Sequence, residues 1–191
     1  NRIGGIMAHP SGEDSTNGGR LIDLSRAVIV QPRGPSGPEA KAVALLADEV
    51  EKRTRLRWAA GHDWPAEPRP VIAVGSAGLL PSLAGPFATG PAAEVRAALA
   101  PEGYRVCAQS GSAPPTVMVI GHDARGVLYG VGRLLRNLRL GPGAALLPED
   151  FDVTSAPRYR LRGHQLGYRD KTNSYCGWDL PQWEQYYRDL I

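Results

Sequence analysis

The sequence of 191 residues lacks several features that would place it quickly in a class of proteins. No stretch approaches the ~18 consecutive apolar residues that a membrane-spanning helix needs. A complete eightfold β/α barrel needs about 250 residues, so the chain is too short to contain one. Lysine is scarce, and the arginines that supply most of the 22 basic residues are scattered. With a net charge of only +3, this pattern does not indicate the clustered basic patch that nucleic-acid-binding proteins have.

Cysteine is scarce too, and no metal-binding pattern is present. Cys107 lies in a predicted strand and Cys176 in a distant polar segment, so we expect two thiols rather than a disulfide. The four histidines are never spaced four residues apart, and the motif H-E-x-x-H is absent. We therefore expect neither a metal ion nor a cofactor.

Two segments have the spacing of amphipathic helices. The first begins at Ser36, which forms a capping-box pair with Glu39. Its apolar stripe consists of Val43, Leu46, Ala47 and Val50. The second begins at Asp123, a favourable N-cap residue. Its apolar stripe consists of Val127, Val131, Leu134, Leu135 and Leu138.

Short runs around these helices have the composition of strands. Residues 70–75 and 116–121 are continuously apolar, which predicts buried strands, and residues 103–109 alternate as a half-buried strand does. Gly126 and Gly130 stand one turn apart in the second helix and predict its close approach to a sheet. The expected fold class is α+β (an α/β two-layer domain), with a mixed β-sheet and two main helices on one face.

The expected organisation has four parts, which follow from changes in composition along the chain. They are a flexible lead-in (1–25), an α/β domain (26–140), a turn-rich connector (141–157) and a strand, loop and helix (158–191). The last part has a strand over 158–168 and a helix that starts after Asp179. Such a unit is typical of the beginning of a larger α/β structure, so we expect the chain to be a truncated piece of one.

Three short motifs resemble the N-terminal part of certain glycosidases. Residues 123–136 are similar to the helix pattern A-x-G-x-x-Y-G-x-x-x-L of their small α/β domain. Tyr104 lies in a G-Y-x-V strand, where E-x-Y-x-L is common, and residues 157–163 look like the P-R-F-x-x-R-G that opens the catalytic barrel. Over residues 26–191 the chain resembles family 20 β-N-acetylhexosaminidases and family 67 α-glucuronidases.

This resemblance implies a non-catalytic, zincin-like accessory domain of a glycoside hydrolase, followed by the first strand, loop and helix of the barrel. The implied partner is the enzyme's own catalytic barrel, which would act on an oligo- or polysaccharide in a secreted or periplasmic setting. Gly167 stands where hexosaminidases have aspartate, and Arg169 comes one place early, so another glycosidase class fits equally well. No membrane or nucleic-acid partner is expected.

The candidate sugar contacts follow the start of the last predicted strand. Arg162 matches a family arginine that contacts sugar hydroxyls, although a salt bridge at the domain junction explains it equally well. Beyond it, aromatic rings could cover sugar C–H groups while polar groups bond the hydroxyls. The alternative is an ordinary solvated loop. The candidates are Arg162, Tyr168, Arg169, Asp170, Asn173, Tyr175 and Trp178.

No catalytic pair can be named from this part of the chain. Glycoside hydrolysis normally uses two carboxyl groups, and Asp170 and Asp179 are the carboxylates in the cluster. Asp179 is explained as a helix cap, so we expect the catalytic acid on a later barrel strand. The stripe formed by Trp183, Tyr186 and Tyr187 is interpreted as core packing.

Two other functions remain open. The first is a stand-alone carbohydrate-binding or interaction module, with Tyr175 and Trp178 on a rigid exposed surface. The second is a nucleotide-binding enzyme fragment, because Gly75-Ser-Ala-Gly78 follows a predicted strand as a phosphate loop does. The full glycine pattern and the lysine of such loops are absent.

Overall fold

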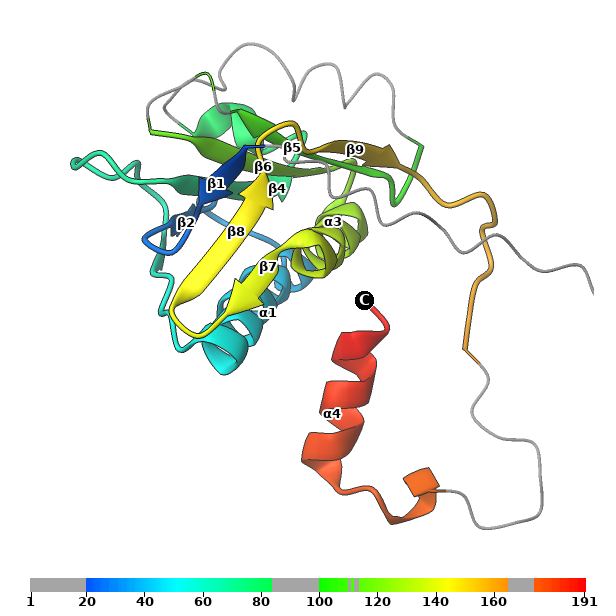
Figure 1. Cartoon of the computed structure of the whole chain (residues 1–191). Coiled ribbons are helices and arrows are strands. Elements are labelled where there is room, and N and C mark those ends of the chain that lie inside the picture. Colours follow the sequence, from blue (N-terminus) through cyan, green and yellow to red (C-terminus); the bar gives the residue numbers. More distant parts are fainter. Residues whose placement is uncertain (1–19, 84–99, 110, 112–113, 165–173) are drawn as a thin grey trace, which may run out of the picture.

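The computed structural model describes residues 20–83, 100–109, 111, 114–164 and 174–191 (Figure 1). This part of the chain forms an α+β domain with two sheets. Its helices are α1 (Gly37–Thr54), α3 (Ala124–Asn137) and α4 (Leu180–Asp189), with 3-10 turns η1 (Leu80–Ser82) and η2 (Ser174–Gly177). Its strands are β1 (Leu21–Asp23), β2 (Val28–Val30), β3 (Ala60–Gly61), β4 (Val71–Ser76), β5 (Tyr104–Gln109), β6 (Thr116–Gly121), β7 (Arg139–Gly141), β8 (Ala144–Pro148) and β9 (Asp152–Ser155).

The main sheet has the strand order β3-β2-β4-β6-β5-β9 and is mixed, as expected. β2, β3, β4 and β6 are parallel, whereas β5 is antiparallel to its neighbours β6 and β9. Side chains alternate between the two faces, so Ile72 and Val74 of β4 join the core beneath the helices. Val71 and Ala73 join a second core on the opposite face, against the η1 segment. Burial on both faces explains the continuous apolar run of this strand.

Helices α1 and α3 pack against each other on one face of the main sheet (Figure 1). The carboxylate of Glu39 accepts hydrogen bonds from the backbone N–H and the hydroxyl of Ser36, at 2.9 and 2.7 Å. Asp123 accepts from the backbone N–H of Gly126 at 2.9 Å and so caps α3. Both predicted helices and their shared face are therefore confirmed.

The two glycines of α3 allow the helix to touch the sheet. A Cβ atom on Gly126 would lie 2.2 Å from the carbonyl oxygen of Gly103, and one on Gly130 would lie 2.8 Å from a methyl carbon of Val119. Neither position has room for a side chain unless the backbone or the core moves. The close approach that these glycines predicted is therefore confirmed.

A second, three-stranded sheet has the order β1-β8-β7, and its strands β7 and β8 contact α1. It corrects two expectations. The lead-in expected over 1–25 ends in β1, and Ile22 and Leu24 are buried in the core. The connector expected over 141–157 contains β8 and β9, and Ala145 and Leu147 of β8 alternate into the same core. β8 is only five residues long and lies between turn residues, with Gly141, Pro142 and Gly143 before it and Pro148 at its end, so its segment resembles a loop in composition.

The C-terminal part of the chain has a different character. The strand expected over 158–168 is absent from its described part, 158–164, where the chain runs away from the sheet without a strand partner among the described residues (Figure 1). Residues 165–168 of that prediction lie outside the described residues. Helix α4 forms after Asp179 as predicted and lies on the side of α1 and α3 that faces away from the main sheet (Figure 1).

None of the helices in the described residues is long and apolar enough to cross a membrane. Cys107 is buried in β5 and Cys176 is exposed in η2, and they form no disulfide, as expected.

Candidate functional site

Arg162, the candidate sugar-contacting arginine, forms an ion pair with Glu102. One of its nitrogens donates to the carbonyl oxygen of Tyr159 at 2.6 Å, and its guanidinium carbon lies 5.8 Å from the centre of the Tyr129 ring. Glu102 accepts a further hydrogen bond from Arg125 at 2.8 Å. The salt bridge that the sequence offered as one explanation of Arg162 is therefore present.

The geometry around Glu102 is fixed by the start of α3. Its backbone N–H donates to the Asp123 carboxylate at 2.9 Å, and its φ of 63° lies in the left-handed region, which non-glycine residues adopt rarely. The hydrogen bonds from Arg162 and then from Arg125 lower the pKa of Glu102 below its ordinary value. The same bond to Glu102 raises the pKa of Arg162. The pair is fully charged at neutral pH, so Glu102 is an acceptor and not a proton donor there.

A pocket of about 610 Å³ lies beside this ion pair. It is bounded by β5, α3, the segment after β9 and the end of α4. The hydroxyl of Tyr186 forms a hydrogen bond with Nδ1 of His164 close to its edge. The side chains that line it include Glu102, Tyr104, Tyr129, Arg136, Arg162, His164 and Leu190.

Tyr175 and Trp178, two further candidates, belong to an aromatic cluster with the rings of α4. The Tyr175 and Trp178 rings are 6.0 Å apart, and Trp178 and Trp183 meet edge to face at 5.2 Å. Tyr186 and Tyr187 complete this aromatic cluster. The core packing expected for the α4 stripe is wrong, because no residue of α4 is buried. The aromatic rings shield one another instead of filling the core.

The structure does not bring all the candidates to one place. Arg162 is held beside the start of β5 by Glu102, whereas Tyr175 and Trp178 lie in the aromatic cluster beside α4. The remaining four candidates, Tyr168, Arg169, Asp170 and Asn173, lie outside the described residues.

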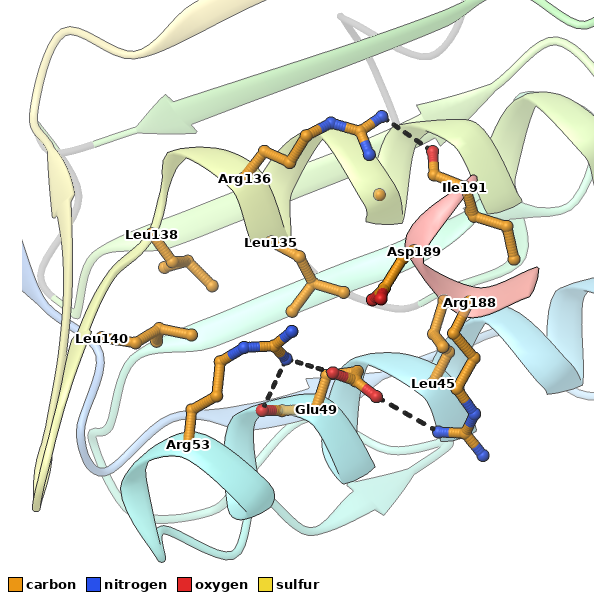
Figure 2. Close-up of a pocket in the computed structure, with 11 residues that line it drawn as sticks. Leu45, Glu49, Arg53, Leu135, Arg136, Leu138, Leu140, Arg188, Asp189 and Ile191 are labelled. Atoms are coloured by element: carbon orange, nitrogen blue, oxygen red, sulfur yellow. Dashed lines mark hydrogen bonds and ion pairs between the residues drawn. The ribbon is translucent and has the colours of Figure 1, made fainter. Parts of the chain in front are cut away.

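Helix α4 is attached to α1 through polar side chains (Figure 2). Arg188 is the centre of this contact: its guanidinium lies 3.2 Å from Asp48 and 3.6 Å from Glu49. The carboxylate of Glu49 is almost fully buried and also pairs with Arg53. Beside these charges is a pocket of about 380 Å³ whose apolar wall includes Leu45, Leu135, Leu138 and Leu140. Every guanidinium that Figure 2 labels already has a partner within the chain.

The segment that resembles a phosphate loop is occupied by a carboxylate. Oε1 of Glu39 accepts the backbone N–H of Ser76 at 3.1 Å, which is the kind of group a phosphate would need. Burial alone would raise the pKa of Glu39, but the hydrogen bonds from Ser36 and Ser76 outweigh it and lower the pKa. A Cβ on Gly75 would lie 3.0 Å from Pro32. Gly75 is therefore explained by close packing, and an anion at this place would meet a charged carboxylate.

Sequence reasoning missed several residues that surround Arg162. Glu102 is the most important, and its signal was present: Glu102, Gly103 and Tyr104 match the start of the E-x-Y-x-L pattern. Tyr129 was quoted only as part of a helix motif, although it lies against Arg162. His164 and Arg136 carried no pattern that would single them out. Within the described residues, no group of three or more His, Cys, Asp or Glu side chains could hold a metal ion.

No protein-family model matches the sequence. No curated protein matches it either. Among solved structures, the chain is similar to the GH20 β-N-acetylhexosaminidase of Streptomyces coelicolor A3(2), with 20% identity and a TM-score of 0.47, over 74% of this chain and 24% of that one. It is similar to the GH115 4-O-methyl-α-glucuronidase BtGH115A, with 17% identity and a TM-score of 0.45, over 72% of this chain and 18% of the other.

A third similar structure is CpGH84B, with 14% identity and a TM-score of 0.47, over 83% of this chain and 24% of that chain. These proteins are glycoside hydrolases, the group that the sequence motifs resemble. The chain spans about a quarter or less of the length of each of them.

Proposed function

We propose that the chain is the non-catalytic, zincin-like N-terminal domain of a glycoside hydrolase. Residues 158–191 would form the first strand, loop and helix of its catalytic β/α barrel. The domain would support the barrel at the junction, and the whole enzyme would act on an oligo- or polysaccharide.

One observation carries this proposal: three motifs that are far apart in the sequence meet in space. Gly126 of the helix motif lies against Gly103, and Gly130 lies against Tyr104 of the strand motif. Arg162 of the barrel-opening motif binds Glu102. Residues that resemble one family in three separate segments, and that pack on one another, form a single structural unit rather than three chance matches.

The charge state of the site supports a non-catalytic role. A general acid needs a raised pKa to hold its proton at neutral pH, and the pKa of Glu102 is lowered by its two arginines. Glu102 is the acidic residue that lines the pocket beside Arg162. The catalytic acid would therefore come from the barrel. Arg162 and Tyr168 from the barrel's first strand, and Arg169, Asp170, Asn173, Tyr175 and Trp178 from the loop after it, would face the substrate.

The test combines the reading frame that encodes this chain with an assay of its whole product. The proposal expects a barrel of about 250 residues after Ile191. It also expects that the whole product hydrolyses aryl glycosides of N-acetylglucosamine or glucuronic acid, whereas the 191-residue chain alone does not. A stop codon directly after Ile191, or turnover by the chain alone, would overturn it.

The aromatic cluster favours a second candidate, a carbohydrate-binding module that works without a barrel. Trp178 and Trp183 are its tryptophans, so bound sugar would change their emission. Titration of the 191-residue chain with chitooligosaccharides separates the two candidates. The accessory-domain proposal expects no response in the chain alone.

A further inference from the structure

We infer that the domain has a binding site for one neutral sugar unit at the carboxyl ends of β2 and β3, which we call the edge pocket. It has a volume of about 340 Å³ and is lined by Arg33, His62, Asp63, Trp64, Ser82 and Leu83. β3 forms one edge of the main sheet and β9 the other, so the edge pocket lies far from the strand that leads to the C-terminal segment. The inference goes beyond the proposed function, because it uses neither the barrel nor residues 158–191.

The topology of the main sheet favours a ligand at this place. β2, β3 and β4 are parallel, so their carboxyl ends lie at the same edge of the sheet. The segment after β2 leads into α1 on one face, whereas the segment after β4 leads into η1, where Leu80 and Leu83 join the core on the opposite face. In open sheets of this kind, ligands bind in the crevice where neighbouring strand ends send the chain to opposite faces.

A charged pair forms the rim of the edge pocket. Nη2 of Arg33 donates to both carboxylate oxygens of Asp63, at 3.0 and 2.9 Å. Arg33 stands between Pro32, which packs against Gly75, and Gly34, whose φ of 70° lies in the left-handed region. The turn therefore fixes the backbone from which Arg33 projects. Because the pair engages one nitrogen of Arg33, the other guanidinium N–H groups and the remaining carboxylate lone pairs can bind a ligand.

Two further polar side chains are held in place by backbone carbonyl groups. Nδ1 of His62 lies 3.0 Å from the carbonyl oxygen of Gln31. Since a carbonyl oxygen only accepts, Nδ1 carries the hydrogen, and Nε2 of the neutral ring is an acceptor. The hydroxyl of Ser82 donates to the carbonyl oxygen of Leu79 at 2.6 Å, so its lone pairs are what a ligand can use. Both side chains therefore offer acceptors to the hydroxyl groups of a ligand.

Trp64 supplies an aromatic wall. Its side chain is half-buried and packs against the core that contains Leu80 and Leu83, so the ring is held by the body of the domain. The same side chain lines the edge pocket. An aromatic ring presents an apolar face, which suits the C–H groups of a sugar ring.

This combination of groups favours a neutral ligand that is rich in hydroxyl groups. A phosphate or carboxylate would approach the Asp63 carboxylate, which costs free energy. A guanidinium beside a carboxylate can donate to one hydroxyl and accept from the next, so the pair of Arg33 and Asp63 fits hydroxyls on adjacent carbons. The volume is near the lower limit of roughly 300–1,000 Å³ for small-molecule pockets, which suits one sugar unit.

The requirement for adjacent hydroxyls predicts which oligosaccharides bind. In cellotetraose, a β-1,4-linked glucose chain, each internal unit has free hydroxyls at C2 and C3. In chitotetraose an acetamido group replaces the hydroxyl at C2, so the internal units have no adjacent pair. A site built to bind a hydroxyl rejects an analogue that lacks it, so we expect chitotetraose to bind at least about tenfold more weakly than cellotetraose.

Nuclear magnetic resonance of the 191-residue chain tests this inference. The chain has four tryptophans, and loss of one indole N–H signal in Trp64→Phe identifies the signal of Trp64. We expect cellotetraose to shift this signal to saturation and to leave those of Trp178 and Trp183 in place. Chitotetraose at the same concentration measures the preference for the C2 hydroxyl.

A pair of matched variants tests the role of the rim. The side chains of Asp63 and Glu67 are 81% and 79% exposed, and each pairs with an arginine, but only Asp63 lines the edge pocket. Neither substitution by alanine should disturb folding. We expect Asp63→Ala to weaken the binding of cellotetraose at least about tenfold, and Glu67→Ala to leave it unchanged.

The remaining outcomes overturn the inference. They are no shift of the Trp64 signal at about 5 mM cellotetraose, equal binding of chitotetraose, or equal binding by Asp63→Ala and Glu67→Ala. A shift confined to Trp178 and Trp183 would assign sugar binding to the aromatic cluster, and a shift with inorganic phosphate alone would identify an anion site. None of these results bears on the proposed function, which is tested by the reading frame and the activity of the whole product.

Discussion

Helices α3 and α4 begin in the same way, each after an aspartate whose side chain accepts the backbone N–H of the third helical residue at 2.9 Å. Both have an apolar stripe. In α3 most of the stripe is buried: Val127, Val131 and Leu134 have no exposed surface, and Leu135 is partly buried against the same core. In α4 no residue is buried, and its contacts with α1 are made by charged and amide groups, while Ile191, directly after the helix, packs against the edge of the core.

The difference shows what amphipathicity does and does not specify. An apolar stripe indicates that a helix has one face to bury, but which surface covers that face depends on the rest of the chain. For α3 the cover is the main sheet, which comes from strands on both sides of it in the sequence. For α4, the described residues of α1 offer ion pairs and hydrogen bonds. The helix is therefore attached to α1 through its polar face, which contributes less to stability than a buried apolar face does.

Truncation of one leucine in each helix should give the largest difference in stability between α3 and α4. Leu134 is fully buried in α3, so Leu134→Ala should lower the free energy of unfolding by about 2–5 kcal/mol. Leu180 in α4 is 80% exposed, so Leu180→Ala should change it by less than about 0.5 kcal/mol. Urea unfolding of the 191-residue chain measures both. A large loss for Leu180→Ala would mean that the α4 face is covered in the chain alone.

Two glycines of α3 sharpen the comparison within a single helix. A Cβ on Gly126 would strike the carbonyl oxygen of Gly103, so Gly126→Ala should cost about 1–3 kcal/mol of stability. A Cβ on Gly132 would lie 2.3 Å from the backbone oxygen of Ile191, so Gly132→Ala should displace the end of α4 instead. We expect it to reduce the amide protection of residues 188–191 in hydrogen exchange while the unfolding midpoint changes little. A lower midpoint for Gly132→Ala than for Gly126→Ala would contradict this division.

Local chemistry made the body of the domain largely predictable from the sequence. Both faces of β4 and β6 are covered, so these strands are continuous apolar runs, and Ser36, Glu39 and Asp123 mark helix starts through hydrogen bonds within a few residues. β8 was missed because its neighbours in the sheet, β1 and β7, contribute only three residues each. Its pairing with β1 joins segments far apart in the sequence, and its hairpin with β7 is too short to show a clear alternation, so little local pattern marks this sheet.

The candidate site was less predictable because it depends on contacts between distant segments. Arg162 was singled out from a motif, but its partner Glu102 is 60 residues away and projects from a left-handed turn. The spacing of apolar residues along the chain predicts helices and strands, but it does not predict an ion pair between two such distant residues. The α4 stripe was recognised correctly as apolar and placed wrongly in the core, because the spacing of Trp183, Tyr186 and Tyr187 is the same whether the surface that covers them is present or not.

The smallest expected effect concerns the ionic attachment of the C-terminal segment. Arg188 and then Lys41 lower the pKa of Glu184, and Arg162 and then Arg125 lower that of Glu102. A carboxylate whose pKa is lower in the folded state contributes fully above its unfolded pKa of about 4.3, and the contribution is lost as the pH falls through the folded value. Acid should therefore loosen α4 while the apolar core that holds α3 is unaffected.

Hydrogen-exchange protection factors for residues 180–191 and for α3 measure this directly. Lowering the pH from 7 to 3, or raising the salt from about 0.05 to 1 M, should reduce the protection of α4 by less than about tenfold and leave α3 unchanged, because exposed ion pairs are weak and screened by salt. Arg188→Met should reproduce the loss at pH 7 and remove most of the salt dependence. Arg20→Met, which removes a surface ion pair with Glu149 in the body of the domain, should do neither. Equal loosening of α3 and α4 in acid would show that the two helices unfold as one cooperative unit. It would also show that the ion pairs between α4 and α1 are not what keeps α4 in place.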